Sequence, residues 1–156
     1  MYEYQVQAEM ECEFRKSGSF YNAYPSIVAG GANACILHYT ENDWVLNDGD
    51  LLLIDAGAEY QCYASDISRT FPVNGKFSGE QRALYDIVLS AQQASFEKCQ
   101  PGCTWNESHD AAVATISQGL IDEGLLKGSL EEVLESKAYS EFYTVSYTHL
   151  TLPTKA

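Results

Sequence analysis

Basic residues are scarce in this chain of 156 residues, which has 9 Lys and Arg against 22 Asp and Glu. The formal net charge of −13 argues against nucleic acid or an anionic membrane as a main partner, because phosphate recognition requires clustered positive charge. No apolar run approaches the ~20 residues that cross a bilayer. The first residues also lack the basic and apolar regions of a secretory signal. We therefore expect an acidic protein of the cytoplasm.

A disulfide framework is also missing. The five cysteines are odd in number and irregularly spaced, whereas disulfide-rich domains pair an even number at regular spacings. Cys99-Gln-Pro-Gly-Cys103 resembles a metal-binding or redox motif. However, the three residues between its cysteines form a turn, and no second Cys or His pair lies nearby in the sequence. We expect all five cysteines to be reduced. Hydrophobic residues make up 46% of the chain, which is sufficient for the core of one domain.

The first half of the chain alternates between helical and extended patterns. Residues 2–16 predict a helix that ends at Gly18. Residues 26–30 and 34–38 are short strand candidates on either side of a glycine pair. A turn at 47–50 leads into a third, strongly apolar strand.

Three later segments share the pattern Ser/Thr-x-x-Glu/Gln, which satisfies free N–H groups at a helix start. The pairs are Ser78 with Gln81, Thr104 with Glu107, and Ser129 with Glu132. Apolar residues repeat at helical spacing after the first two. Helices that follow a curved antiparallel sheet predict an α+β fold, in which the helices cover one face of the sheet and the site occupies the other.

The most informative residues are two aspartates, Asp55 and Asp66, on the flanks of a predicted hairpin. If the strands pair about Tyr60-Gln61, the two side chains are direct cross-strand partners with Cβ atoms roughly 5 Å apart. Carboxylates that close repel each other, so either one is protonated or a cation lies between them. Carboxylate oxygens suit Mn, Mg or a dinuclear hydrolytic site. On geometry alone, two separately solvated aspartates remain the alternative.

The amino-acid sequence around the two aspartates carries more information than the spacing between them. Asp55-Ala-Gly-Ala-Glu-Tyr60 and Ser65-Asp-Ile-Ser-Arg-Thr-Phe-Pro72 resemble the first metal-ligand hairpin of the Xaa-Pro aminopeptidase (aminopeptidase P) family, which belongs to the pita-bread metallopeptidases of family M24. Further similar segments are Tyr2 to Phe14, Tyr24-Pro-Ser-Ile-Val28, Asn33, Cys35 to Asn42, Asp48-Gly-Asp50 and Phe71 to Phe77. The resemblance implies that residues 1–143 are the first half of a pita-bread catalytic domain.

Residues 144–156 do not follow the family pattern. The family chain continues into a Gly-His-x-Leu-Gly segment that bears a histidine ligand, and this chain does not. His149 is not assigned as a replacement, because its neighbours do not match that segment. We interpret 144–156 as a foreign tail, either disordered or artefactual.

The resemblance also assigns roles to individual residues. It implies two divalent metal ions, with Mn(II) expected, of which Asp55 would chelate one and Asp66 would bridge both. His38 matches a family histidine that binds the scissile peptide, although a histidine after an apolar run is on its own more often a packed residue. Arg69 is expected to pair with a nearby carboxylate, with substrate binding as the alternative. The remaining family ligands, one histidine and two glutamates, are absent.

These features predict a fragment of a cytoplasmic aminopeptidase that releases the N-terminal residue from peptides with proline in the second position. Because ligands are absent, we expect the isolated chain to be inactive, and the resemblance implies a homo-oligomer at full length. A prolidase-type dipeptidase is the alternative within the fold. A metal-free pita-bread module that binds a partner is the alternative from another class.

Overall fold

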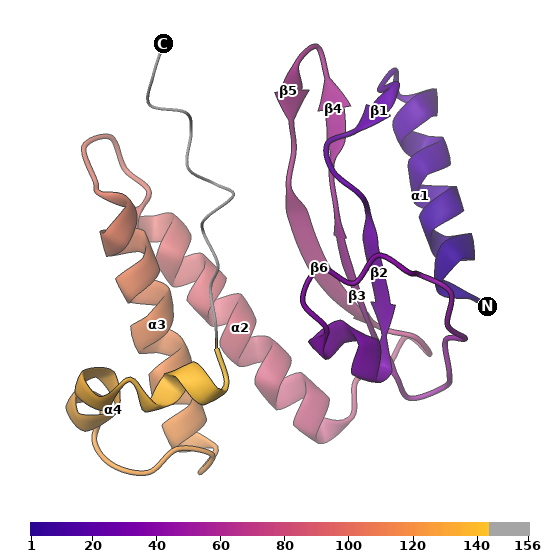
Figure 1. Ribbon diagram of the computed structural model, residues 1–156. Coiled ribbons are helices and arrows are strands. Elements are labelled where there is room, and N and C mark those ends of the chain that lie inside the picture. The colour runs from indigo at the N-terminus through magenta and orange to yellow at the C-terminus, as the bar shows by residue number, and fades with distance from the viewer. Residues whose placement is uncertain (144–156) are drawn as a thin grey trace. The chain divides into compact units, whose positions relative to one another are not determined.

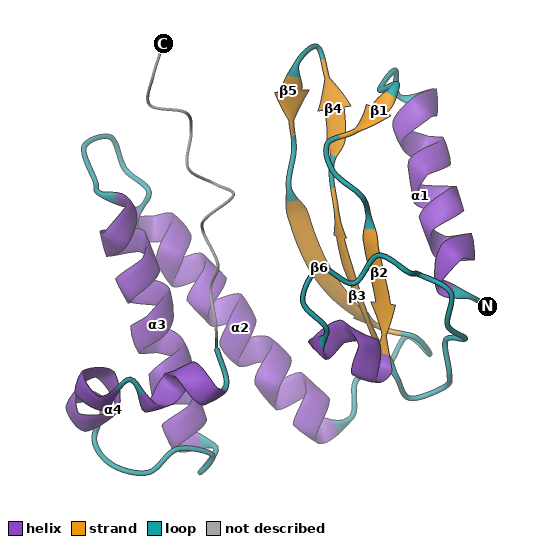
Figure 2. Ribbon diagram, in the orientation of Figure 1, coloured by secondary structure: helices purple, strands orange, loops and turns teal. Residues whose placement is uncertain are grey.

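The computed structural model describes residues 1–143. These residues fall into two compact units, of which the first spans Met1–Ser78 and the second begins at Gly79. The first unit mixes strands with one long helix, whereas the second is helical (Figures 1 and 2).

The first unit contains two three-stranded antiparallel sheets. Its elements are α1 (Glu3–Lys16), β1 (Tyr21–Asn22), β2 (Ile27–Gly30), the 3-10 helix η1 (Gly31–Cys35), β3 (Leu51–Ala56), β4 (Ala58–Tyr60), β5 (Tyr63–Ala64) and β6 (Ile67–Pro72). One sheet has the order β1-β4-β5 and the other β2-β3-β6. The chain runs from β3 into β4 and from β5 into β6 with short breaks, so one long hairpin contributes to both sheets.

The predicted N-terminal helix is confirmed, and it packs against the β2-β3-β6 sheet. The backbone N–H of Tyr2 donates to Gln5 Oε1 at 2.8 Å, which caps the helix start. On the inner face of α1, Val6 and Met10 pack against a buried cluster that includes Val28 and Leu52. Burial of these aliphatic side chains, at about 1.5–3 kcal/mol each, holds the helix on the sheet.

A fully buried carboxylate, that of Glu3, lies at the first turn of α1. Its Oε1 accepts from the Gly30 N–H at 2.7 Å and from Asn33 Nδ2 at 3.1 Å. Its Oε2 accepts from the Tyr39 hydroxyl at 2.7 Å and from the Trp44 N–H at 2.9 Å. Four donors compensate the cost of burying the charge, so Glu3 fixes α1 to the end of β2 and to the loop that follows.

The prediction of a strand over 34–38 is wrong. The chain forms the 3-10 helix η1 at this point, and its end is closed by a bond from the Ile36 N–H to the Asn33 carbonyl at 2.9 Å. The cause is a set of side-chain hydrogen bonds, because Asn33 Nδ2 reaches both the distant Glu3 carboxylate and the Tyr39 hydroxyl, at 3.1 Å each. These bonds favour a turn over an extended strand.

The second unit contains α2 (Gly79–Lys98), α3 (Trp105–Asp122), α4 (Leu130–Ser136) and the 3-10 helix η2 (Ala138–Glu141). All three predicted helix starts are confirmed. The Thr104 N–H donates to Glu107 Oε2 at 2.6 Å, and the Ser129 N–H donates to Glu132 Oε2 at 2.8 Å. Within this unit, α2 and α3 enclose a core of their own, in which Ala91, Ile116 and Leu120 are buried.

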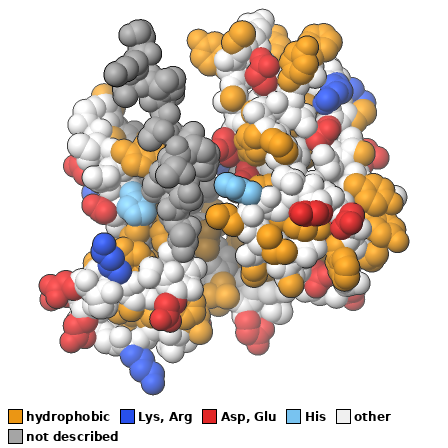
Figure 3. Space-filling model, in the orientation of Figure 1, with side chains coloured by type: hydrophobic (Ala, Val, Ile, Leu, Met, Phe, Trp, Pro, Cys, Tyr) orange, Lys and Arg blue, Asp and Glu red, His pale blue; other side chains and the backbone are white. Residues whose placement is uncertain are grey.

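Several large apolar side chains remain on the surface of the first unit. Phe20, Tyr21 and Tyr63 are 79%, 69% and 82% exposed, and Figure 3 shows hydrophobic side chains over this part of the chain. All five cysteines are unpaired and exposed. None of the helices in residues 1–143 is both long enough and apolar enough to span a bilayer.

The Glu3 network predicts how stability depends on pH. Burial alone would raise the pKa of Glu3, but the hydrogen bonds from Gly30, Tyr39, Trp44 and Asn33 outweigh it and lower the pKa below its ordinary value of 4.5. A carboxyl with a lowered folded-state pKa stabilises the fold above its unfolded-state pKa. That stabilisation is lost as pH falls through the folded-state pKa.

We therefore expect Glu3→Gln to lower the free energy of unfolding by about 2–4 kcal/mol at neutral pH. The reason is that the amide NH2 group would face N–H and O–H groups that are themselves hydrogen-bond donors. The loss should shrink as the pH falls below 4.5. Urea denaturation at several pH values measures both effects, with Glu9→Gln on the exposed face of α1 as the control. A loss that stays constant with pH would contradict the role of the charge.

Candidate functional site

The two predicted metal ligands both accept a hydrogen bond from the hydroxyl of one tyrosine. Asp55 is half-buried near the end of β3, and Asp66 is exposed just before β6. The hydroxyl of Tyr24 lies 2.7 Å from Asp55 Oδ1 and 3.0 Å from Asp66 Oδ1. The two Oδ1 atoms therefore cannot be farther apart than the sum of these distances, so both carboxylates converge on one point.

The expected register of the hairpin is wrong by two residues. Asp55 pairs with Ser68, and the two-residue turn is Gln61-Cys62 in place of Tyr60-Gln61. Gln61 and Cys62 have φ values of 50° and 69°, the positive pair that a type I′ turn requires. Because side chains alternate with a period of two, a shift of two residues keeps both aspartates on the same face. They are diagonal neighbours rather than direct partners.

Gly57 allows the hairpin to bend beside Asp66. A Cβ at Gly57 would lie 1.7 Å from the Ser65 carbonyl oxygen, so no other residue fits this approach. The ladder changes here, because the Ala58 N–H donates to Ser65 Oγ at 2.9 Å while the Ser65 N–H donates to the Ala58 carbonyl at 3.0 Å. The Gly57 carbonyl is left for the Ala23 N–H, at 2.8 Å. The break between the two sheets is thus where Asp66 lies.

The charge of this cluster is suited to a cation. Burial, followed by the hydrogen bonds to Asp55 and Asp66, raises the pKa of Tyr24 well above its usual range, so its hydroxyl remains a donor. One hydroxyl proton cannot neutralise two carboxylates. A set of hard oxygen atoms with excess negative charge fits Mn(II) or Mg(II). Within residues 1–143 no third Asp, Glu, His or Cys completes a metal-binding group of three.

His38, the predicted catalytic residue, lies on a different segment from the two aspartates. It is exposed, has a φ of 55°, and follows η1 in the loop that leads to β3, where Tyr39 is the next residue. The Tyr39 hydroxyl is held by Glu3, which anchors the residue next to His38. The structure thus brings Asp55 and Asp66 together through Tyr24 and places His38 on an anchored loop, while its catalytic role stays a prediction.

Comparison with known proteins identifies the family. The profile of metallopeptidase family M24 matches residues 1–151. The chain belongs to metallopeptidase family M24. Two similar M24 relatives are called Xaa-Pro aminopeptidase, one from Haemophilus influenzae, 49% identical over 148 residues, and one from Escherichia coli, 45% identical over 149 residues. They match 95% and 96% of this chain, which spans about a third of their length, 34% in each case.

Solved M24 structures agree. The chain superposes on the aminopeptidase PepP of Pseudomonas aeruginosa with a TM-score of 0.89 at 55% identity, over 90% of this chain and 32% of that one. A zinc-substituted Escherichia coli aminopeptidase P in complex with product gives a TM-score of 0.87 at 46% identity, with the same coverage. The predicted α+β class and partial pita-bread fold are confirmed. The assignment of 144–156 as a foreign tail lies outside the described residues and stays a prediction.

The contacts of Arg69 and of one further histidine, His109, are also described in this M24 chain. Arg69 does not pair with a carboxylate within residues 1–143, since its guanidinium donates to the Ser68 carbonyl at 2.7 Å. That expectation is wrong. The ring of His109, on α3, stacks on Tyr143 with centroids 6.4 Å apart. His149 lies outside the described residues.

Tyr24 is the site residue that the sequence analysis did not select. It belonged to a segment that resembles the family, but a tyrosine with no charged neighbour in sequence carries no chemical signal of its own. Two features indicate a fixed position in retrospect. It precedes Pro25, which favours an extended backbone, and it lies three residues before Ile27, the pairing partner of Asp55.

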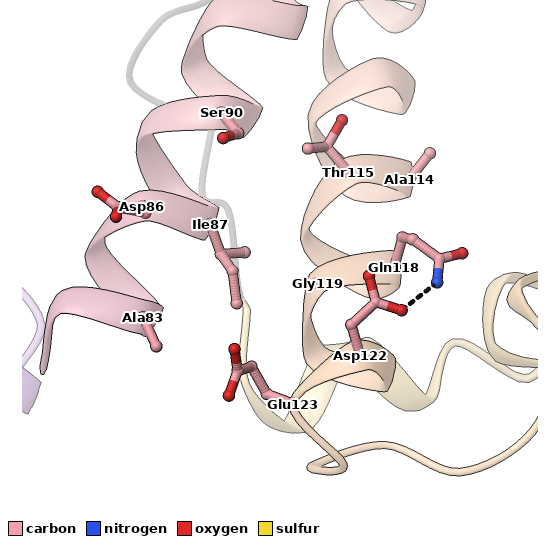
Figure 4. Close-up of a pocket in the computed structure, with 10 residues that line it drawn as sticks. All are labelled: Ala83, Asp86, Ile87, Ser90, Ala114, Thr115, Gln118, Gly119, Asp122 and Glu123. Atoms are coloured by element: carbon pink, nitrogen blue, oxygen red, sulfur yellow. Dashed lines mark hydrogen bonds between the residues drawn. The ribbon is translucent and has the colours of Figure 1, made fainter. Parts of the chain in front are cut away.

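An open groove of about 680 Å³ lies between α2 and α3 (Figure 4). It is lined entirely by the second unit, namely by Ala83, Asp86, Ile87, Ser90, Ala114, Thr115, Gln118, Gly119, Asp122 and Glu123. Two of its acids already have partners, since Asp86 pairs with Arg82 at 2.8 Å and Asp122 accepts from Gln118 at 2.8 Å. The groove contains none of the predicted site residues.

The close approach at Gly57 gives a stability prediction. We expect Gly57→Ala to lower the free energy of unfolding by about 3 kcal/mol or more, because the new methyl group meets a backbone oxygen that cannot move aside. Urea denaturation followed by circular dichroism measures the change. Gly79→Ala is the matched control, since a Cβ there meets no atom within 4 Å. Equal stability of the two variants would show that the hairpin relaxes freely.

Proposed function

We propose that residues 1–143 are the first half of a dinuclear metal-dependent Xaa-Pro aminopeptidase, which releases the N-terminal residue from peptides with proline in the second position. The observation that carries the proposal is the convergence of Asp55 and Asp66 on the Tyr24 hydroxyl. It is supported by the relatives called Xaa-Pro aminopeptidase and by the solved aminopeptidase P complexes with substrate and with product. The proposal extends to a cytoplasmic location and a homo-oligomer at full length.

Asp55 and Asp66 would hold the metal, and Mn(II) is the ion we propose because all the donor atoms are hard oxygens. A pair of such ions supplies Lewis-acid activation of water and of the scissile carbonyl. Asp55 is fixed by its place in β3 between β2 and β6. Asp66 is exposed and so can face a second ligand group contributed by the rest of the protein.

His38 is proposed to bind the scissile peptide and to stabilise charge that develops on it. His38 is an exposed residue of the first unit. Its position is set indirectly, through the bond between Tyr39 and Glu3. A positioned group of this kind contributes most when the charge in the transition state exceeds that in the substrate.

The alternatives are weaker on specific grounds. A metal-free binding module has no need of two carboxylates held on one hydroxyl, an arrangement that costs repulsion unless a cation compensates it. A prolidase-type dipeptidase would use the same pair, but the named relatives favour the aminopeptidase.

The chain by itself should bind Mn(II) weakly and cleave no Xaa-Pro peptide. Two carboxylates provide too few ligands to close a dinuclear site, and the described residues offer no third. The test incubates purified 1–156 with excess Mn(II) and an Xaa-Pro peptide. Turnover that a chelator abolishes would contradict this expectation.

A chimera tests the function itself. When this chain replaces the matching segment of the Escherichia coli relative, the product should release the first residue of an Xaa-Pro peptide and spare the same peptide with alanine in the second position. Asp66→Asn removes a charge but keeps the shape, so metal content and turnover should fall together. Asp48→Asn, at an exposed turn, is the matched control. Full metal content and full rate in Asp66→Asn would refute the assignment.

In the same chimera, His38→Ala should leave the metal content unchanged and lower kcat/KM by about 10²–10⁴, the usual range for a positioned proton-transfer or charge-stabilising group. Metal analysis beside steady-state kinetics separates this role from that of the aspartates. Loss of metal in His38→Ala would instead make His38 a ligand.

A further inference from the structure

The backbone on both sides of Tyr24 is fixed by the sheets. The Ala23 N–H donates to the Gly57 carbonyl at 2.8 Å, and Ile27 pairs with Asp55 in the β2–β3 ladder. Pro25 restricts its own φ and keeps Tyr24 extended. The phenol ring therefore starts from a backbone that is tied to the same strands that carry the two aspartates.

The hydroxyl of Tyr24 is also the one polar contact that the two carboxylates share. Among residues 1–143, it is the only hydrogen-bond partner of either carboxylate. Asp66 is exposed, so without this contact its carboxylate would gain rotamer freedom and full hydration away from Asp55. In each carboxylate it is Oδ1 that accepts the hydrogen bond from the hydroxyl.

We propose that Tyr24 is a positioning residue that holds Asp55 and Asp66 in a convergent arrangement and thereby sets the affinity of the pair for a hard divalent cation. The inference rests on the proposed function, because it assigns the pair to a metal. It adds a residue that contacts the ligands and does not itself bind the ion.

Removing the hydroxyl could change the Mn(II) affinity of the pair in two opposite ways, and the larger effect decides whether the affinity rises or falls. The hydroxyl is neutral, so its loss leaves the net charge at the pair unchanged and adds little attraction for a cation. Its loss does release two side chains that must then be ordered by the metal. Removal of an outer contact to a metal ligand typically costs 10–100-fold in affinity. We expect Tyr24→Phe to bind Mn(II) about tenfold more weakly.

The first measurement is Mn(II) affinity of the full 156-residue chain, from the free-ion signal in electron paramagnetic resonance. Tyr24→Phe keeps the ring and removes only the hydroxyl. Tyr21→Phe is the matched control, because its side chain is 69% exposed and its hydroxyl makes no hydrogen bond with residues 1–143. Weaker binding in Tyr24→Phe with unchanged binding in Tyr21→Phe supports the inference. Equal or tighter binding in Tyr24→Phe overturns it and leaves the proposed function standing.

The second measurement needs no metal. In the presence of a chelator, Tyr24→Phe is introduced into the natural chain and into the Asp55→Ala, Asp66→Ala double variant, and the urea midpoints are compared. If Tyr24 holds the carboxylates, the shift caused by Tyr24→Phe should largely disappear in the double variant. An equal shift in both backgrounds overturns the inference even if the natural chain binds no Mn(II), a result that would count separately against the proposed function.

Discussion

The carboxylate of Glu3 connects four parts of the first unit that are distant in sequence. Its two oxygens accept from the end of β2, from η1, from Tyr39 and from Trp44. A buried charge with all its donors in place strongly favours one arrangement, since loss of any partner leaves an uncompensated group in the core. The loop of His38 begins and ends at these contacts, so the position of a proposed catalytic residue depends on a glutamate in the first turn of a helix.

A second constraint, steric rather than electrostatic, shapes the site. The long hairpin would be an ordinary pair of strands if both continued straight, but Gly57 lets the Ser65 carbonyl approach to a distance that no side chain permits. The Ser65 hydroxyl then replaces a ladder contact to Ala58. At this break Asp66 is turned toward Tyr24 while Asp55 remains in the ladder. The glycine after Asp55-Ala56 therefore helps to set the relative positions of the two aspartates, the proposed metal ligands.

The structural features that were predicted correctly from the sequence are those that depend on a local pattern of residues. Capping boxes located the helix starts, and the apolar run located β3, because each signal lies within a few residues. The strand expected over 34–38 failed because Asn33 is bonded to Glu3, thirty residues away in the chain. The predicted register of the hairpin was wrong because Gln61-Cys62 forms a turn that is usually made by Asn-Gly. The residue types at this turn therefore did not reveal its position. Tyr24 was missed for the same reason as Asn33, since its partners are distant in sequence.

The convergence of Asp55 and Asp66, the proposed metal ligands, depends on the first unit alone. Their positions depend only on β2, β3, β6 and the segment of Tyr24, all within the first unit. The pair therefore needs no other part of the protein to converge. Affinity is a different matter, because one hydroxyl proton leaves most of the negative charge in place, and two ligands cannot saturate a divalent ion. The geometry of the pair is thus encoded in this chain, whereas under the proposed function further ligands would have to complete the site.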